Sequence, residues 1–432
     1  MIRIIRHSEV DELLSRLAAR SVAFDSELLE QVTSIINDVR KRGDAALIEY
    51  AKRFDSVELQ PSEMRITQEA LRRSASAVGD EVLAALRLAI KNVRAFHERQ
   101  REQSWEIAPD YGVRLGVRLG QRITPLERVG LYVPGGTAAY PSSIVMNVVP
   151  AQVAQVERIV VTTPPRTLTE NPAVAAALLE LNVSEVYAVG GAQAIAALAF
   201  GTETIPRVDK ITGPGNKYVA AAKKLLFGVV GIDSIAGPSE IVIVADQSAR
   251  AEFVAADLLA QAEHGEDASA VLITTDEAWA ERVAEEVIRQ VASLPRRSIV
   301  QSSLENYGAI VLVETLESAV SLVNELAPEH VELATTDDEA LAAKIKHAGA
   351  IFFGSYTPEA VGDYLAGPNH VLPTGRTARF SSALGVYDFV KRTSLLKYSS
   401  SAFNAVADSV AVLAECEGLA AHARSATIRK EK

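Results

Sequence analysis

Cysteine is almost absent from this chain of 432 residues, and its scarcity excludes two classes of site. A single thiol, Cys416, can form neither a disulfide framework nor a metal site built from several thiolates. It lies in an alanine-rich segment without a basic neighbour to activate it, so we interpret it as a small buried helix residue rather than a nucleophile. This composition is consistent with a reducing compartment.

Excess positive charge and long apolar runs are missing as well. The net charge of -11 and the pI of about 5.3 argue against nucleic acid or an anionic membrane as a partner. The richest apolar stretch, residues 186–201, contains a glutamine and two adjacent glycines and is too short to cross a bilayer. Charged side chains interrupt residues 1–20, where a secretory signal would need an apolar core. We therefore expect a soluble cytoplasmic protein.

The apolar pattern divides the chain into four regions. Residues 1–110 show helical spacing and predict a mainly helical region, which we expect to pack on the second α/β unit. Residues 111–237 and 238–375 alternate β-rich runs with alanine-rich helical runs, an order typical of a parallel sheet with helices on both faces. Residues 376–432 predict a helical tail, because the β signal fades there. The predicted fold is α/β, with two incomplete Rossmann-like domains between a helical N-terminal region and a small C-terminal tail.

Glycine-rich turns follow several predicted strands. They are Val133–Gly136, Gly190–Gln193, Gly213–Asn216 and Gly237–Ser239. Ligands of open α/β sheets bind at the carboxyl ends of strands, where glycine lets backbone N–H groups approach a phosphate. One such turn alone is better explained as a simple reversal of the chain. The polar side chains of Gln193, Asn216 and Ser239, and Tyr132 before the first turn, favour nucleotide binding, although the G-x-G-x-x-G fingerprint is missing.

Histidine is scarce too, yet four of the seven histidines accompany a carboxylate or a glutamine in the second half of the chain. The pairs are Gln261 with His264, Glu329 with His330, Asp363 with His370, and Glu417 with His422. A spacing of three places Gln261 and His264 on one helical face. With Asp363 and His422 they offer two imidazoles, a carboxylate and an amide oxygen, which suit zinc, with manganese or cobalt able to substitute. Each residue alone has an ordinary structural explanation, and glutamine is an uncommon ligand.

Glu329 and His330 precede an apolar predicted strand. Adjacent glutamate and histidine on a loop can act in turn as base and acid. A structural role, with the glutamate capping a turn and the histidine partly buried, competes with this interpretation. Glu332 alternates with the apolar residues of the strand, so we expect it to face solvent.

Eight motifs, taken together and in this order, are typical of one enzyme family. They are Val133–Gly136, Gly190–Gln193, Gly213–Asn216, Ala236–Glu240, Gln261–Gly265, Ala327–His330, Gly362–Tyr364 and Asn369–Pro373. On these motifs the chain resembles the histidinol dehydrogenase family from about residue 24 to near the C-terminus.

The resemblance implies a zinc- and NAD-dependent homodimer with shared active sites and one zinc ion per subunit. Such an enzyme oxidises L-histidinol through L-histidinal to L-histidine, the last step of histidine biosynthesis, and reduces two NAD molecules. The first α/β domain would bind NAD, and the second would carry the zinc and acid–base residues. The C-terminal tail would reach into the partner's site.

The resemblance also implies a role for each matching residue. The zinc ligands would be Gln261, His264, Asp363 and His422. The proton acceptors would be Glu329 and His330, and NAD would contact Tyr132, Gln193 and Asn216. Besides the zinc ligands and His330, the substrate would contact Ser239, His370 and Glu417. Glu415, seven residues before His422 and therefore on its helical face, competes with Glu417 for that role.

Three other functions remain open. The first is a paralogous zinc and NAD alcohol dehydrogenase that acts on another small hydroxyl substrate, such as a sulfonated diol. The presence of His370 and Glu417, which would meet an imidazole ring, argues against it. The second is a metal-dependent hydrolase in which Glu329 activates water, and this leaves the glycine-rich turns unexplained. The third is a non-catalytic binding protein.

Overall fold

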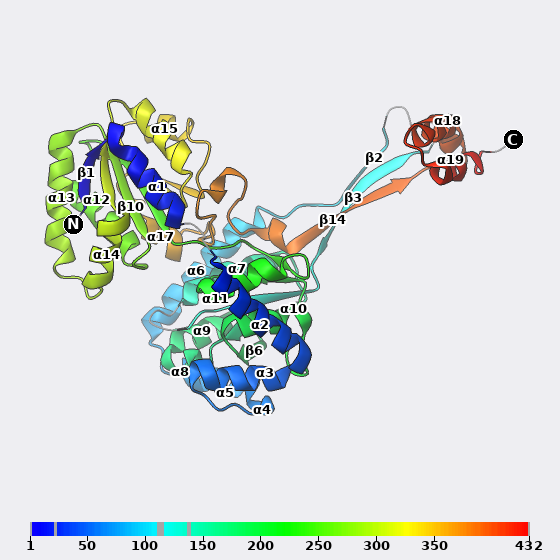
Figure 1. Ribbon diagram of the computed structural model, residues 1–432, viewed down its shortest axis with the longest axis horizontal. Helices are drawn as coiled ribbons and strands as arrows, with labels where there is room; N and C mark the ends of the chain where they lie inside the picture. The colour runs from blue at the N-terminus through cyan, green and yellow to red at the C-terminus, as the bar shows by residue number, and fades with distance from the viewer. Residues whose placement is uncertain (1, 21–23, 110–115, 136–139, 431–432) are drawn as a thin grey trace. The chain divides into compact units, whose positions relative to one another are not determined.

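The computed structural model describes residues 2–20, 24–109, 116–135 and 140–430, so Gly136 of the first glycine-rich turn lies outside the described residues. Within these ranges the chain divides into two compact units, residues 1–100 with 127–389 and residues 101–126 with 390–432. The first unit contains two parallel sheets covered by helices, sheets A and B (Figure 1). No helix in the described ranges combines the length and the apolar character needed to cross a membrane.

Sheet B has the strand order β6-β5-β4-β7-β8, and all its strands pair in parallel. The strands are β4 (Arg128–Tyr132), β5 (Arg158–Thr163), β6 (Glu185–Ala188), β7 (Lys210–Thr212) and β8 (Gly231–Ile232). From β4 the chain moves outward to β5 and β6, then returns to the other side of β4 to form β7. The direction of winding therefore changes between β4 and β7, and such a switch point opens a ligand-binding crevice at the carboxyl ends of the strands.

Helices from two parts of the chain cover sheet B. The helices that follow its strands are α7 (Pro141–Val153), α8 (Thr167–Glu170), α9 (Pro172–Glu180), α10 (Gly191–Phe200) and α11 (Lys217–Leu226). The N-terminal helices are α2 (Ser26–Arg42), α3 (Asp44–Tyr50), the π-helical turn η2 (Ala51–Asp55), α4 (Pro61–Met64), α5 (Gln68–Ala75) and α6 (Asp80–Glu98). Residues 192–199 of α10 are all buried, because α10 lies between the sheet and α2.

The expectation that residues 1–110 pack on the second α/β unit is wrong for most of this region. Val32 of α2 and Leu47 of α3 belong to the same hydrophobic core as Val160 of sheet B, and α6 packs against α7. An amphipathic helix reveals which of its faces is buried, but its pattern does not say which of two similar apolar surfaces it covers.

Sheet A has the parallel strand order β1-β11-β10-β9-β12-β13. Its strands are β1 (Arg3–Arg6), β9 (Glu240–Ala245), β10 (Ser269–Thr274), β11 (Ala309–Leu312), β12 (His330–Ala334) and β13 (Ala350–Phe353). The surrounding helices are α1 (Val10–Arg20), α12 (Ala251–Ala262), α13 (Glu277–Val291), α14 (Arg297–Tyr307), α15 (Leu316–Leu326), α16 (Asp338–Ala342) and α17 (Glu359–Tyr364). Single helical turns are η1 (His7–Glu9), η3 (Thr377–Arg379) and η4 (Val386–Phe389).

Both faces of sheet A are buried. Ile241 and Ile243 of β9 enter the core beneath α12, α13 and α14, whereas Val242 and Val244 enter the core beneath α1 and α15. This alternation explains why the strand is apolar throughout. The strand β1 corrects the prediction of a helical start: it pairs in parallel with β11 and forms an edge of sheet A, and so short a segment carries no strand signal without that neighbour.

The second unit contains an antiparallel sheet, sheet C, with the order β14-β3-β2 (Figure 1). Its elements are β2 (Trp105–Ile107), β3 (Arg118–Pro125), β14 (Val390–Lys397), α18 (Ser400–Cys416) and α19 (Ala420–Thr427). The tail is therefore not helical throughout, because β14 pairs with β3 along eight residues. Most of β14 is exposed, so its sequence lacks the apolar alternation that marks a half-buried strand.

A buried ion pair fixes the turn after β7. The Lys223 ammonium, on a residue that is 2% exposed, donates to the carbonyl of Gly213 over 3.0 Å and pairs with the Asp233 carboxylate. Asp233 accepts the Gly213 N–H over 2.8 Å. Gly213 has φ +109°, and a Cβ there would collide with the carbonyl oxygen of Tyr132. Glycine, lysine and aspartate together therefore hold this turn against the end of β4.

We expect Lys223→Met to lower the free energy of unfolding by about 3–5 kcal/mol, because it leaves the Asp233 carboxylate buried without its counter-charge. Urea denaturation followed by circular dichroism measures the change. Lys224→Met, at the exposed neighbouring position of the same helix, is the matched control and should cost about 1 kcal/mol or less. Equal stability of the two variants would contradict this account of the turn.

Candidate functional site

A cavity of about 380 Å³ lies between the turns that end β4 and β7 of sheet B and the amino ends of β9 and β12 of sheet A. Residues singled out from the sequence form much of its wall. They are Asn216, Ser239, His264, Glu329, His330, Asp363 and His370. Sheet B thus meets the cavity at the carboxyl ends of its strands, as expected, whereas sheet A meets it at their amino ends.

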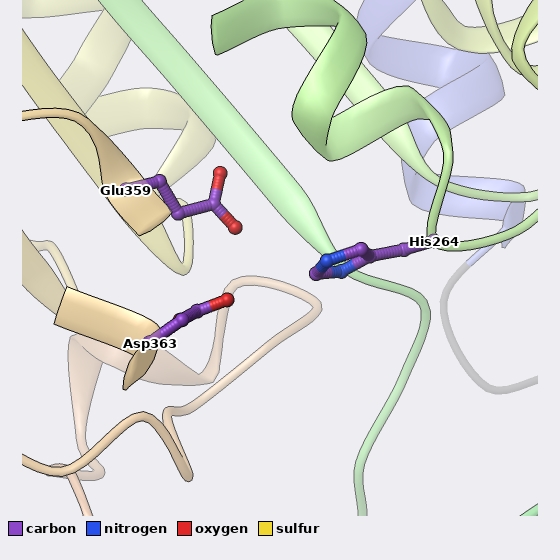
Figure 2. A group of neighbouring side chains, drawn as sticks. All are labelled: His264, Glu359 and Asp363. Carbon is purple, nitrogen blue, oxygen red and sulfur yellow. The ribbon is translucent and has the colours of Figure 1, made fainter. Parts of the chain in front are cut away.

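Three side chains form a compact group at this cavity. His264, Glu359 and Asp363 each offer a ligand atom, and these atoms all lie within 4.8 Å of one another. Figure 2 shows the two carboxylates and the imidazole turned toward the same space. Glu359 and Asp363 are four residues apart in α17 and therefore share one helical face. His264 directly follows the end of α12.

Gln261 lies in the last turn of α12, one turn before His264. The residue is completely buried, and neither polar atom of its amide has a hydrogen-bond partner among the described residues. Both carboxylate oxygens of Glu359 are likewise buried without a hydrogen-bond partner among the described residues. A buried polar atom without a partner costs about 1–3 kcal/mol, so these groups are suited to a ligand that would satisfy them.

The donor set fits a divalent cation. An amide oxygen, an imidazole and two carboxylates suit zinc, manganese or cobalt. Burial raises the pKa of Asp363 to about 6, opposed by nearby His264, and raises the pKa of Glu359 well above its usual range. Burial also lowers the pKa of His264. A bound cation would oppose the two carboxyl shifts, because it favours the carboxylate anions, and it would reinforce the neutral state of the imidazole.

His330 is held as a neutral base. Its Nδ1 lies 3.0 Å from the backbone carbonyl of Glu240, so this nitrogen carries the proton and donates it. Nε2 has no hydrogen-bond partner among the described residues and lies 3.9 Å from Oδ1 of Asp363. Burial lowers the pKa of His330 to about 3, which keeps the imidazole neutral near pH 7. Its free lone pair can therefore accept a proton at the cavity.

Glu329 is fixed beside it. The Glu329 carboxylate accepts the backbone N–H of Glu240 over 3.0 Å. Burial raises its pKa well above the usual range, and the negative charges of Glu240 and Asp363 raise it further. A carboxylate with a raised pKa is a better general base than an exposed one. Arg20, at the end of α1, pairs with Glu240 over 2.5 Å and anchors this corner of sheet A.

His370 contributes a second neutral imidazole to the wall. Its Nδ1 lies 2.9 Å from the backbone carbonyl of Asp363, and its Nε2 lies 3.4 Å from the hydroxyl of Ser143. Burial lowers the pKa of His370 to about 4. With Ser239, it gives this part of the cavity small polar groups that suit a heteroaromatic ring.

A second cavity, of about 830 Å³, lies at the carboxyl ends of the strands of sheet B. Its wall includes Tyr132, Gln193 and Asn216, and it shares Pro134, Gly135 and Asn216 with the first cavity. The Tyr132 hydroxyl accepts the N–H of Gly191 over 3.1 Å, and burial raises its pKa to about 12. Asn216 caps α11 through its side-chain oxygen. The predicted nucleotide contacts therefore border one space, and that space adjoins the first cavity, whose wall includes His330.

Glu417 and His422 belong to the second unit. Glu417 caps the end of α18, and His422 lies in α19 with its side chain exposed. Glu415 is exposed as well, so exposure does not decide between the two glutamates. The group that the first unit assembles accordingly consists of His264, Asp363 and Glu359, and Gln261 precedes His264 by one helical turn.

The structure also corrects or extends three expectations. Glu332 is buried rather than exposed, because helices cover both faces of sheet A, and it accepts the backbone N–H of Glu359. Cys416 is exposed rather than buried, because α18 buries a stripe of alanines that does not include it. Glu359 was missed, although its spacing of four from Asp363 is a signal for two carboxylates on one helical face.

Comparisons with known proteins agree over nearly the whole chain. Residues 18–430 match the family model of histidinol dehydrogenase. A histidinol dehydrogenase of Geobacillus kaustophilus is 56% identical over 402 residues, which cover 93% of each chain. A histidinol dehydrogenase of Geobacter sulfurreducens is 50% identical over 98% of each chain. The crystal structure of histidinol dehydrogenase from Elizabethkingia anophelis matches with a TM-score of 0.90 at 35% identity, covering 99% of this chain and 97% of that one.

Proposed function

The chain belongs to the histidinol dehydrogenase family, and on this premise we propose that it oxidises L-histidinol through L-histidinal to L-histidine at the cavity lined by His330. Members of this family are NAD-dependent oxidoreductases that act on an alcohol group in the final step of histidine biosynthesis. One observation carries the proposal. A neutral histidine with a free Nε2 lies beside a metal-type group, at a cavity that adjoins a second space of nucleotide size.

We propose that Gln261, His264 and Asp363 of one subunit and His422 of the partner subunit hold one zinc ion. The unsatisfied amide of Gln261 and the compact group around Asp363 support this set. Glu359 is the further acidic residue of the group. When bound, zinc would supply a Lewis acid that holds the nitrogen atoms of the substrate, and NAD would supply the hydride acceptor.

The two oxidations require two proton acceptors. In the first, His330 accepts the hydroxyl proton through Nε2 while a hydride leaves the carbinol carbon for NAD, which gives the aldehyde. Glu329 then removes a proton from the water that adds to the aldehyde. Loss of a second hydride from the hydrate to NAD gives the carboxylic acid. General acid–base catalysis of this kind is worth about 10²–10⁴ in rate, and no thiol is required.

The two cavities support most of the proposed substrate and dinucleotide contacts. Ser239, His370 and Glu417 are proposed to hold the imidazole and the polar end of L-histidinol. Tyr132, Gln193 and Asn216 are proposed to border NAD, whose nicotinamide must reach the wall that both cavities share. The free lone pair of His330 supports this direction, because proton and hydride transfer occur at the same carbinol group.

We further propose a homodimer in which Glu417 and His422 act in the partner's site. The second unit carries exposed apolar side chains that a partner would cover. They are Trp105, Ile107, Leu396, Val412 and Leu413. Because the reaction draws on the NAD pool and ends in a free amino acid, we place the enzyme in the cytoplasm.

Removal of the metal should abolish the formation of NADH from NAD and L-histidinol. The measurement is NADH absorbance after treatment with a chelator. The residual metal content is measured by mass spectrometry. Zinc added back should restore turnover, and circular dichroism should be the same before and after. Full turnover by protein shown to be metal-free would contradict the role of zinc.

His330→Asn should slow the first oxidation by about 10²–10⁴, because the substrate hydroxyl loses its proton acceptor. Single-turnover NADH formation measures the step, and zinc content should stay at the wild-type level because His330 is not a proposed ligand. His347→Asn, outside both cavities, is the control and should leave the rate unchanged. Wild-type turnover of the His330 variant would remove this residue from the mechanism.

Mixed dimers test whether the site is shared. Asp363→Asn and His422→Asn should each inactivate the homodimer, because each removes a proposed ligand from both sites. After subunit exchange, mixed dimers should regain up to about a quarter of wild-type activity, since half of the dimers are mixed and each has one intact site. Exchange can be verified by native mass spectrometry. No recovery after complete exchange would indicate that all ligands come from one chain.

A further inference from the structure

One end of the second cavity is lined by charged and aromatic side chains to which the proposed function gives no role. From the wall shared with the first cavity, the second cavity extends to residues of α2, α3, η2 and the turn after β5. This far end, which we call the distal pocket, is lined by Tyr50, Arg53, Phe54, Asp55, Arg166 and Glu170. The cavity volume of about 830 Å³ is within the range of small-molecule and cofactor sites.

The orientation of the dinucleotide indicates which of its parts lies in the distal pocket. Hydride transfer places the nicotinamide near Pro134, Gly135 and Asn216, which both cavities share. The adenosine end therefore points to the distal pocket. Tyr50 and Phe54 form a stacked pair there, with ring centroids 5.5 Å apart and planes within 1° of parallel. Tyr50 is buried, so the exposed aromatic surface belongs to Phe54, which is 51% exposed and suits the stacking of a base.

Asp55 is the polar group best placed to meet the ribose. It ends the π-helical turn η2, and its side chain is partly buried. Its Oδ2 is buried and has no hydrogen-bond partner among the described residues. Burial raises the pKa of Asp55, whereas the nearby Arg166 guanidinium lowers it and so favours the ionised carboxylate. In dinucleotide-binding folds, a carboxylate at the adenosine ribose accepts hydrogen bonds from the hydroxyls.

The basic residues of the distal pocket are occupied by other groups. Arg166 donates to the carbonyl of Ser56 over 3.4 Å and lies near the Asp55 carboxylate. The Arg53 guanidinium lies over the ring of Phe54, 5.2 Å from its centroid. Glu170 adds a second negative charge to the wall. A 2′-phosphate would therefore meet a carboxylate first, and like charges at close range repel.

We infer that Asp55 holds the adenosine ribose hydroxyls of the dinucleotide and excludes a 2′-phosphate, so that this residue sets a preference for NAD over NADP. The inference rests on the proposed function, because it takes the second cavity as the dinucleotide site. Removal of the carboxylate would also leave Arg166 free to bind a phosphate, so one substitution should change affinity for the two dinucleotides in opposite directions.

Two probes without a nicotinamide test this inference by binding alone. Calorimetry on the zinc-loaded, full-length enzyme would compare ADP-ribose with 2′-phospho-ADP-ribose. We expect the wild type to prefer ADP-ribose by at least about 10²-fold. In Asp55→Asn, ADP-ribose should bind about tenfold more weakly and the phosphorylated probe more tightly, so that the preference falls to about tenfold or less. The ratio of kcat/KM for NAD and NADP should shift in the same direction.

Two control variants separate a specific effect of the Asp55 carboxylate from a general loss of charge or structure. Glu170→Gln removes the other carboxylate of the distal pocket and should change the preference by less than Asp55→Asn. Asp55→Ser, compared with Asp55→Asn by thermal unfolding, separates loss of charge from loss of structure. An unchanged preference in a folded Asp55 variant, with ADP-ribose still bound, would overturn the inference and leave the proposed function intact. Failure of the wild type to bind ADP-ribose would overturn both the inference and the placement of NAD in this cavity.

Discussion

The site depends on negative charge that the first unit buries without enough positive charge to balance it. Glu329, Glu359 and Asp363 lie together at the amino edge of sheet A, and burial raises the pKa of each. Taking carboxylates out of water is costly unless they are paired or bind a metal. Arg20 lowers the pKa of Glu329 in part, but it is already paired with Glu240. The arrangement is therefore best explained as a receptor for a cation and a cationic substrate, rather than as a source of stability.

The rest of the first unit holds these buried carboxylates and the neighbouring His330 in place. The central strands β9 and β12 are buried on both faces, so the backbone at Glu240 and His330 has little freedom. Two hydrogen bonds between these strands then orient the acid–base pair: the Glu240 N–H binds Glu329, and the Glu240 carbonyl binds Nδ1 of His330. The same carbonyl selects the tautomer whose Nε2 is free. Sheet B orients two of the proposed NAD contacts in the same way, because Asn216 is held by the start of α11 and Tyr132 by Gly191.

Prediction from the sequence succeeded where a local pattern has one physical meaning. The alternation of apolar strands and alanine-rich helices implies parallel sheets covered by helices, and the structure has two of them among its described residues. It failed where a segment distant in the chain determines the local structure or the burial of a residue. The strand β14 lacks an apolar pattern and forms because β3 offers it a backbone edge. Glu332 follows the alternation of an exposed strand position, yet α12 covers it. Asp55 ends a π-helical turn, and nothing in its local sequence indicates that this turn borders a cavity at the carboxyl ends of the strands of sheet B.

The sequence alone supported a prediction of the kind of chemistry, because the rare residues lie in short motifs whose side-chain types restrict what they can bind: imidazoles, carboxylates and one amide suit a metal, and glycine-rich turns suit a nucleotide. It also identified the α/β class, which depends on local periodicity. Only the tertiary structure decided which of these residues meet. It brought Glu359 to His264 and Asp363, left Nε2 of His330 without a hydrogen-bond partner among the described residues, and placed residues of α2 and α3 in the wall of the second cavity. The physical reason is that proximity across hundreds of residues comes from the packing of whole sheets and helices, which no single segment encodes.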